Sequence, residues 1–392
     1  MKSQSRQWFV CLLLSCCVCA AASPLPINSL SMKGVLGGQT SEQDDHFKQV
    51  LNPRVFQFPR DHLAHQAYKT EWWYLSGNLS ANSLNESGST HKFAYQFTLF
   101  RFALRPEKSS SENSAWRSSN IYMAHIALTD LNHHKFYQQE RFSRDALSLA
   151  GAEKKEDGSL QFWLNDWQLK SLAADDLFPL TLDINNDKFA LQLQLETVKP
   201  MVLQGEQGLS QKSSKHASYY YSYTRLASKG NITIEDKVFK VSGNSWFDRE
   251  WSTSSLGEDQ QGWDWFALHL DDGSDLMLYQ MRKKDGSADI YSSGILVDSQ
   301  GHSQVLPASD FHLQVIEYWQ SPVSSIRYPI KWSISIPGKN IKLMVSTQNK
   351  QQEWSKAGGF SFNYWEGSVD VKGIKNQQPV SGSGYLEMTG YD

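Results

Sequence analysis

The chain has 392 residues, of which 38 are Lys or Arg and 41 are Asp or Glu, so its formal net charge at pH 7 is −3. The basic residues form no tract of the kind that binds nucleic acid, and we therefore expect no nucleic-acid partner. A chain of this length exceeds the usual size of one compact domain, which favours two domains.

The first residues have the pattern of an export signal. Lys2 and Arg6 give a positive start, residues 8–19 form an apolar run, and residues 20–22 are small, as at a cleavage site. We expect residues 1–22 to be removed and the mature chain to be exported to the periplasm. The run is too short for a permanent membrane helix, and no later run approaches the roughly 20 apolar residues that one needs.

The cysteines give the same segment a second interpretation. All four, at positions 11, 16, 17 and 19, precede the expected cleavage site, so the mature chain would have neither disulfides nor thiolate metal sites. The alternative is Leu13-Leu14-Ser15-Cys16, which loosely resembles a bacterial lipoprotein cleavage site. In that case a lipid on Cys16 would anchor the protein to a membrane.

After a polar lead-in over residues 23–49, the dominant signal is an alternation of apolar and polar residues with period two, which predicts β-strands. Four such stretches cover residues 91–101, 121–128, 191–195 and 331–336. The clearest hairpin joins residues 263–270 to residues 276–281, because Asp271-Asp272-Gly273 supplies residues that tolerate a positive φ.

No long segment has a helical period, so the sequence predicts an all-β protein with little helix beyond short turns. We expect an N-terminal β domain over residues 50–250 and a C-terminal one over residues 251–392, with the break between Lys237 and Glu258. Polar stretches near residues 80–90, 109–119 and 205–215 are expected to be loops.

Familiar catalytic signatures are missing from the sequence. It has no Gly-x-Ser-x-Gly elbow, phosphate loop, dinucleotide fingerprint or His-Glu-x-x-His motif, which argues against serine-hydrolase, nucleotide and zinc-protease chemistry. The closest histidine pairs, His62 with His65 and His133 with His134, lie in polar context, and we expect surface histidines there. No metal and no cofactor are expected.

Carboxylates stand beside aromatic residues in four clusters. A carboxylate packed among indoles is desolvated, which raises its pKa and allows it to act as a general acid. The competing explanation is structural, because strand Trp and Tyr residues are mostly core and an acid often accepts a hydrogen bond from an indole. The clusters are Glu71-Trp72-Trp73-Tyr74, Trp246-Phe247-Asp248-Arg249-Glu250-Trp251, Trp263-Asp264-Trp265 and Tyr364-Trp365-Glu366.

Strand alternation predicts which residues of two of these clusters lie on the same face of a strand. In the first, Trp72 and Tyr74 should share one face and Glu71 and Trp73 the other, so that one indole lines a cavity while its neighbour packs in the core. In the second, Asp248 and Glu250 should share a face with Trp246, opposite Phe247, Arg249 and Trp251. Two acids flanking a guanidinium favour a function for the second cluster.

Several stretches together resemble the AttH-like and carotenoid 1,2-hydratase-like family of exported bacterial proteins, over a range from about Gln49 to the C-terminus. They are Glu-Trp-Trp-Tyr at 71–74, Tyr-Tyr-Tyr-Ser-Tyr-Thr-Arg-Leu at 219–226, Trp-Phe-Asp-Arg-Glu-Trp-Ser at 246–252, Gly-Trp-Asp-Trp-Phe-Ala-Leu at 262–268, Tyr-Trp-Glu-Gly-Ser-Val at 364–369 and the closing residues 382–391.

The resemblance implies two lipocalin-like antiparallel β-barrels packed together, with an aromatic-lined ligand cavity near their contact. Members have been named as secreted hydrolases, carotenoid hydratases and, more distantly, pericyclases, and the fold alone does not choose between these. Family hydratases carry a His in the turn that matches residues 248–250 and an Asp shortly after a strand Tyr. Arg249 and Met281 stand there, which argues against carotenoid hydration.

The expected partner is an apolar small molecule, lipid-like or isoprenoid-like, and the expected chemistry is acid-initiated hydration or a hydrolysis. Protonation of a double bond would create a cation that aromatic faces stabilise. In this scheme Asp248 or Asp264 donates the proton, Glu250 positions water, and Arg249 holds one acid ionised. The expected ligand-binding residues are Glu71, Trp72, Trp73, His125, Tyr220, Trp251, Trp263, Tyr279, Trp365 and Glu366.

Other functions remain open at this stage. The same barrel and aromatic residues could serve a non-catalytic carrier of an apolar ligand, with the acids as structural pairs. An ester or amide hydrolase would need an Asp-activated water, because the chain lacks a serine-nucleophile motif. An interaction or assembly role is the third alternative.

Overall fold

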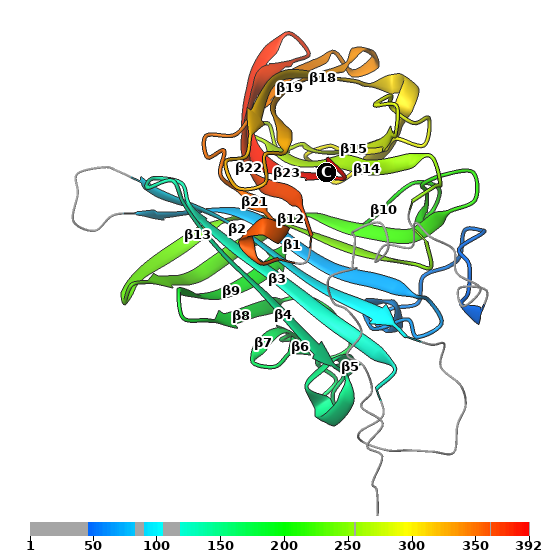
Figure 1. Cartoon of the computed structure of the whole chain (residues 1–392), viewed down its shortest axis with the longest axis vertical. Helices are drawn as coiled ribbons and strands as arrows, with labels where there is room; N and C mark the ends of the chain where they lie inside the picture. Colours follow the sequence, from blue (N-terminus) through cyan, green and yellow to red (C-terminus); the bar gives the residue numbers. More distant parts are fainter. Residues whose placement is uncertain (1–45, 83–89, 105–117, 255, 361, 392) are drawn as a thin grey trace, which may run out of the picture.

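The computed structural model describes residues 46–82, 90–104, 118–254, 256–360 and 362–391. The expected signal, the alternative lipidation site at Cys16, most of the polar lead-in and much of the first two expected loops lie outside these residues. Within them the chain forms two antiparallel sheets, one nearly closed as a barrel and the other a half barrel, which pack against each other (Figure 1). The prediction of an all-β protein with two packed barrel-like units is confirmed.

The first sheet has 13 strands in the order β4-β3-β2-β1-β13-β12-β9-β8-β7-β6-β5, with β10 and β11 paired to β12. The first and last strands of this sheet in sequence, β1 and β13, are neighbours in its middle, because β1 pairs along its length with β13. The strands are β1 Thr70–Asn82, β2 Thr90–Ala103, β3 Asn120–Asp130, β4 Lys135–Arg144, β5 Ala150–Lys154, β6 Leu160–Leu164, β7 Trp167–Ser171, β8 Leu180–Asn185, β9 Phe189–Thr197, β10 Val202–Leu203, β11 Leu209–Gln211, β12 Ala217–Ile234 and β13 Lys237–Ser252.

The second sheet has 10 strands in the order β17-β16-β15-β14-β23-β22-β20-β19-β18, with β21 paired to β22. It also joins distant segments, since its first strand, β14, pairs with its last, β23. The strands are β14 Gln260–Leu270, β15 Asp275–Lys283, β16 Ser293–Val297, β17 Ser303–Pro307, β18 His312–Gln320, β19 Arg327–Ile336, β20 Ile341–Ser346, β21 Glu353–Trp354, β22 Tyr364–Lys375 and β23 Gln378–Thr389.

The predicted strands and hairpin are present. The four alternating stretches lie in β2, β3, β9 and β19, and the hairpin is β14–β15, with Gly273 at a φ of +82° in its turn. The chain passes from the first sheet to the second between the end of β13 at Ser252 and the start of β14 at Gln260. The domain limits at residues 250 and 251 stay a prediction.

Helix is confined to short 3-10 turns in the described part of the chain: η3 Arg60–His62, η4 Ala146–Ser148, η5 Ala308–Asp310, η6 Pro337–Lys339 and η7 Lys356–Gly358. The search for an apolar helix of membrane-spanning length found none among the described residues.

Each sheet encloses its own apolar core, and a third buried cluster lies where the two sheets meet. Strand alternation explains this division, because each strand sends every second side chain into its own core, and the strands at the contact send the others toward the facing sheet. Polar bonds fix the contact as well. Ser368 Oγ donates to Asn78 Oδ1 at 2.6 Å, and Lys199 Nζ and Arg225 Nη2 donate to the Asp275 carboxylate at 2.7 and 2.6 Å.

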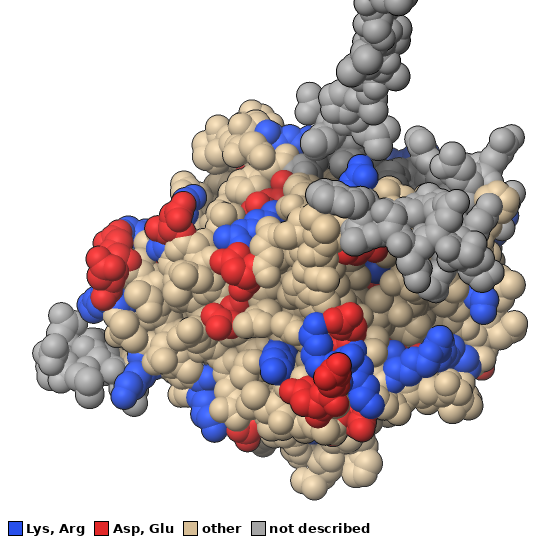
Figure 2. Space-filling model, turned by 90° about the horizontal axis from the view of Figure 1, so that it is seen from below, with Lys and Arg blue, Asp and Glu red and all other residues tan. Residues whose placement is uncertain are grey.

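The outer surface carries a mixture of charges. Figure 2 shows one face on which Lys and Arg side chains are interspersed with Asp and Glu side chains, with no extended patch of one sign.

Candidate active site

A cavity lies at the contact between the two sheets and draws its walls from both. Its empty volume is about 810 Å³, part of which is open to solvent. β1, β2, β12 and β13 supply one wall, and β14, β15, β22 and β23 supply the facing wall. The lining residues are Trp72, Tyr74, Thr98, Phe100, Lys212, Tyr220, Asp248, Glu250, Trp263, Trp265, Tyr279, Met281, Tyr364, Glu366 and Glu387.

Cross-strand pairing arranges the wall from the first sheet in two rows. Phe100, Trp72, Glu250 and Tyr220 are successive partners across β2, β1, β13 and β12. The second row, two residues further along each strand, is Thr98, Tyr74, Asp248 and Ser222. Because residues two apart share a face, the carboxyl groups stand among aromatic rings.

The wall from the second sheet is built in the same way. Glu366, Glu387, Trp265 and Tyr279 are successive partners across β22, β23, β14 and β15. Across the cavity the rings of Tyr74 and Trp265 meet edge to face, with centroids 5.3 Å apart. The two walls therefore touch at their aromatic residues and leave room between their acids.

Asp248 is buried and accepts three hydrogen bonds. Trp246 Nε1 and Ser222 Oγ donate to Oδ1, the indole at 2.8 Å, and the Tyr220 hydroxyl donates to Oδ2 at 2.8 Å. Burial raises the pKa of Asp248 to about 7, although the three donors oppose this shift. A carboxyl with such a pKa can both take and release a proton at neutral pH.

Glu250 has a cationic partner, Lys212. Lys212 Nζ lies 3.1 Å from Glu250 Oε1, and Ser218 donates to the same oxygen. Burial lowers the pKa of Lys212, but the Glu250 carboxylate more than offsets this effect and the net shift is upward. The ammonium also lies 4.4 Å from the centroid of the Tyr279 ring. Lys212 and Glu250 are therefore a charged pair inside an aromatic site.

Glu366 and Glu387 form a second acid pair on the facing wall. They are direct partners in the β22–β23 ladder. Burial raises the pKa of both groups, and the charge of Glu387 raises that of Glu366 further. Glu366 Oε1 and the Tyr74 hydroxyl are both buried, and they lie close enough for Tyr74 to oppose the rise in the pKa of Glu366, but neither atom makes a hydrogen bond of normal geometry among the described residues. Buried polar groups with such incomplete bonding mark a place where a ligand or water can bind.

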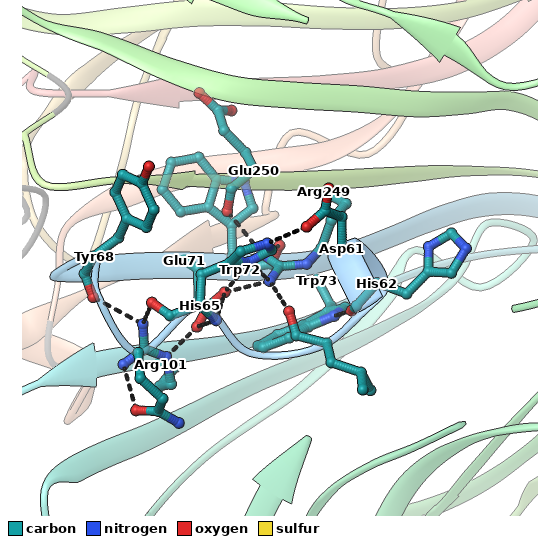
Figure 3. A network of polar contacts seen from close by, with 12 residues as sticks. Asp61, His62, His65, Tyr68, Glu71, Trp72, Trp73, Arg101, Arg249 and Glu250 are labelled. Carbon is teal, nitrogen blue, oxygen red and sulfur yellow. Dashed lines mark hydrogen bonds and ion pairs between the residues drawn. The ribbon is translucent and has the colours of Figure 1, made fainter. Parts of the chain in front are cut away.

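Glu71 belongs to a different site, on the far side of β1. It forms ion pairs with Arg101 and Arg249 and accepts a hydrogen bond from the backbone N–H of His65 at 3.0 Å. Burial raises the pKa of Glu71, but the two guanidinium groups outweigh burial and hold it well below its usual value. In Figure 3, Glu250 points away from this network, on the other side of the strands.

His125 lies directly behind the cavity wall and links the two sheets. Its Nδ1 is 2.6 Å from the hydroxyl of Tyr364, which lines the cavity, and its Nε2 is 2.7 Å from Glu140 Oε2. The ring stacks on Trp354 with centroids 4.4 Å apart. Burial lowers the pKa of His125, so this histidine orients Tyr364 from outside the cavity.

The structure brings together about half of the residues that the sequence suggested. Seven of them line the cavity: Trp72, Tyr220, Asp248, Glu250, Trp263, Tyr279 and Glu366. Six do not: Glu71, Trp73, His125, Trp251, Asp264 and Trp365. The alternation predicted for β1 and β13 is found, with Trp72, Tyr74, Asp248 and Glu250 on the cavity side.

Two expectations about charge partners differ from the structure. Asp264 faces the interior of the second sheet, where its carboxylate lies 3.1 Å from Arg282 Nε and accepts a hydrogen bond from Tyr391 at 2.7 Å. Arg249 does not hold Asp248 or Glu250 ionised, because it points to the opposite face and pairs with Glu71. Glu250 pairs with Lys212 instead.

Eight lining residues were not among the expected site residues. They are Tyr74, Thr98, Phe100, Lys212, Trp265, Met281, Tyr364 and Glu387. Alternation would have found Tyr74, Trp265 and Tyr364, since each is two residues from an expected one. Glu387 and Lys212 meet their cavity partners on other strands, Glu366 of β22 and Glu250 of β13, and alternation within one strand does not specify such contacts.

One group of potential metal ligands is present in the described part of the chain. His91, Asp130 and His133 place their ligand atoms within 4.8 Å of one another. His91 Nε2 and His133 Nδ1 lie 2.8 and 2.7 Å from the Asp130 carboxylate. Hydrogen bonds alone explain this arrangement, and it is not connected to the cavity.

Two barrel-like sheets with an aromatic, acid-bearing cavity at their contact define a lipocalin-like architecture. The chain belongs to the AttH-like family, whose model matches residues 49–391. The family resemblance drawn from the sequence is thereby confirmed.

Individual relatives include hydratases. Kievitone hydratase of Fusarium solani subsp. phaseoli is 21% identical over 234 residues, which are 59% of this chain and 65% of that protein. The structure of an AttH-type protein from Nitrosomonas europaea is 29% identical, covers 88% of this chain and 99% of its own, and has a TM-score of 0.73. Kievitone hydratase from Nectria haematococca shares the fold at 16% identity, with a TM-score of 0.60 and coverage of 88% and 98%.

Proposed function

We propose that the protein is an enzyme that adds water to a carbon–carbon double bond of an apolar ligand, or removes it, inside the cavity between the sheets. The observation that carries the proposal is the combination of carboxyl groups of raised pKa with Trp and Tyr faces in one cavity. The kievitone hydratase relative supports a hydratase-type reaction.

The aromatic walls suit a reaction that passes through a positive charge. Protonation of an alkene leaves a carbocation, which the negative face of a desolvated indole or phenol ring stabilises by up to about 2 kcal/mol. Trp72, Trp263 and Trp265 supply indoles to both walls. The same faces bind the apolar body of a ligand before any reaction takes place.

The acids suit the two proton transfers that hydration requires. One group must give a proton to carbon, and another must take one from the attacking water. Asp248 and the Glu366–Glu387 pair are available for these roles, whereas Glu250 is held by Lys212. A carrier would need the aromatic walls, but it would not need several buried acids without cationic partners.

The test is incubation of the purified protein with a panel of isoprenoid and aromatic alkenes in water labelled with heavy oxygen. We expect at least one product that is heavier by one labelled water molecule, and we expect its formation to be much slower with Asp248→Asn. The matched control is Glu317→Gln, which removes a carboxylate exposed on the second sheet. Tight, stoichiometric retention of an unchanged ligand would contradict an enzyme and establish the carrier.

A further inference from the structure

The four carboxyl groups of the cavity lie on two facing walls. The walls differ in the hydrogen-bond donors and cations that surround these groups. Asp248 and Glu250 belong to β13 of the first sheet, whereas Glu366 and Glu387 belong to β22 and β23 of the second. Because hydration needs one proton donor and one proton acceptor, the surroundings of each wall indicate which role it takes.

The wall from the first sheet surrounds its carboxyl groups with hydrogen-bond donors and one cation, and the donors around Asp248 oppose the rise in its pKa that burial causes. Asp248 accepts hydrogen bonds from Ser222, Tyr220 and Trp246, so all three of these partners donate to it. Glu250 has the Lys212 ammonium and the Ser218 hydroxyl. Hydrogen bonds and a cation that act on a carboxylate favour its charged form. This wall is therefore equipped to accept a proton.

The wall from the second sheet gives its acids fewer partners, one side-chain donor each, Tyr74 for Glu366 and Trp263 for Glu387. Glu366 and Glu387 stand directly opposite each other in the ladder, which places their Cβ atoms about 5 Å apart. No Lys or Arg of the described chain forms an ion pair with either of them, in contrast to Glu250. Two carboxyl groups held together without a cation cannot both ionise, so the pair retains a proton.

We propose that Glu366 and Glu387 together hold the proton that is given to the alkene, and that Asp248 on the facing wall takes a proton from the attacking water. This inference rests on the proposed hydration. The π bond opens as one carbon bonds the proton, and the water oxygen then bonds the cationic carbon. The proton lost by that water goes to Asp248, and when the product leaves Asp248 releases this proton to solvent while solvent returns one to the glutamate pair.

The geometry also predicts the stereochemistry of the addition. The proton comes from one wall and the water from the other, and the ligand lies between them. Hydrogen and hydroxyl should therefore add to opposite faces of the double bond. Reaction in D₂O, with the relative configuration of deuterium and hydroxyl read by NMR, should give the anti product, and a syn product would overturn the inference.

Substitution of the acids separates their roles through the pH dependence of the reaction. Glu366→Gln and Glu387→Gln should each lower kcat by about 100-fold or more, with little change in KM. They should also remove the fall in rate at alkaline pH, where the donor loses its proton. Asp248→Asn should instead remove the fall at acidic pH. The reverse assignment of the two limbs would overturn the inference.

A measurement without substrate distinguishes failure of this inference from failure of the proposed function. Infrared difference spectra in H₂O and D₂O should show the band of a protonated carboxylic acid at neutral pH. The band should lose most of its intensity in the double variant Glu366→Gln/Glu387→Gln, and Asp248→Asn should keep the part that this double variant loses, while the control Glu317→Gln should match the wild type. A band as strong in the double variant as in the wild type overturns the inference, even in a protein that hydrates its ligand. If the band behaves as expected and no alkene is hydrated, the result confirms that the glutamate pair holds a proton and contradicts the proposed function.

Discussion

Two adjacent indoles in β1 show how one residue step separates a core position from a site position. Trp73 is fully buried, donates from Nε1 to His62 O at 2.8 Å and lies beneath the Arg249 guanidinium, 4.0 Å from its ring centroid. Trp72 is half-buried and lines the cavity. The pleat of the strand is sufficient to produce this difference.

Truncation of the two indoles should therefore have different effects. Trp73→Ala should lower the free energy of unfolding by about 3–5 kcal/mol, because it leaves a cavity in the core. Trp72→Ala should nearly preserve stability and weaken ligand binding or turnover. Urea denaturation and ligand titration of both variants check this, and an equal loss of stability with unchanged binding would contradict it.

A second prediction concerns the carboxylate of Glu71, which balances two buried guanidinium groups. Glu71→Gln leaves Arg101 and Arg249 without their anionic partner and should cost about 3–5 kcal/mol. The pKa of Glu71 is lower in the folded than in the unfolded chain, so the unfolded state binds the proton more tightly.

The stability that Glu71 contributes is therefore fully present above its unfolded pKa, near 4.5, and is lost as the pH falls toward the lowered folded value. Thermal melts across that acidic range should show a steeper loss for the wild type than for Glu71→Gln. Parallel curves for the two proteins would show that the network does not depend on this charge.

At the scale of strands, alternation within one element was predictable, but the choice of neighbouring strands was not. The sequence pattern divided β1 and β13 correctly. Applied to β14 and β22, it separates Asp264 from Trp263 and Trp265, and Trp365 from Tyr364 and Glu366, as the structure does. The site residues expected from the sequence include Asp264 and Trp365 only because these two residues are adjacent in sequence to residues of the site.

Glu387 and Lys212, which sequence analysis missed, meet their partners across strands. Glu387 meets Glu366 through the register of the β22–β23 hairpin, whose turn is formed by Asn376 and Gln377. Lys212 reaches Glu250 from the segment between β11 and β12. Alternation within one strand does not specify either contact, because both depend on how strands pair.

The β22–β23 pair supports a prediction about alkaline pH. Burial raises the pKa of Glu366 and Glu387 in the folded chain, so the folded state binds their protons more tightly. This contribution to stability is complete below the unfolded carboxyl pKa and declines as the pH rises through the folded values.

Glu366→Gln/Glu387→Gln should remove that decline. Its melting temperature should fall less than that of the wild type between mildly acidic and mildly alkaline pH, as followed by circular dichroism. The control is Glu317→Gln on the surface of the same sheet, which should follow the wild type. A decline as steep in the double variant as in the wild type would contradict a buried acid pair.

At the scale of the whole molecule, the first residues lead to a prediction about compartment. We propose export with removal of residues 1–22, which would give a mature N-terminus at Ser23 and a chain without cysteine. Intact-mass measurement of protein from the periplasmic fraction should give that mass and no reaction with a thiol reagent. A diacylglyceryl adduct on Cys16 would establish the lipoprotein alternative.

The pairing of β1 with β13 and of β14 with β23 has a consequence for the order of events during synthesis. The first sheet cannot close until residue 252 has been made, and the second must wait for the final strand, Gln378–Thr389. Contacts this distant in sequence form slowly, because a long loop must close before they contribute any stability. Since the last strand also carries Glu387, a chain interrupted before this strand is made would lack part of the cavity wall, and the cavity would be completed only when synthesis is nearly finished.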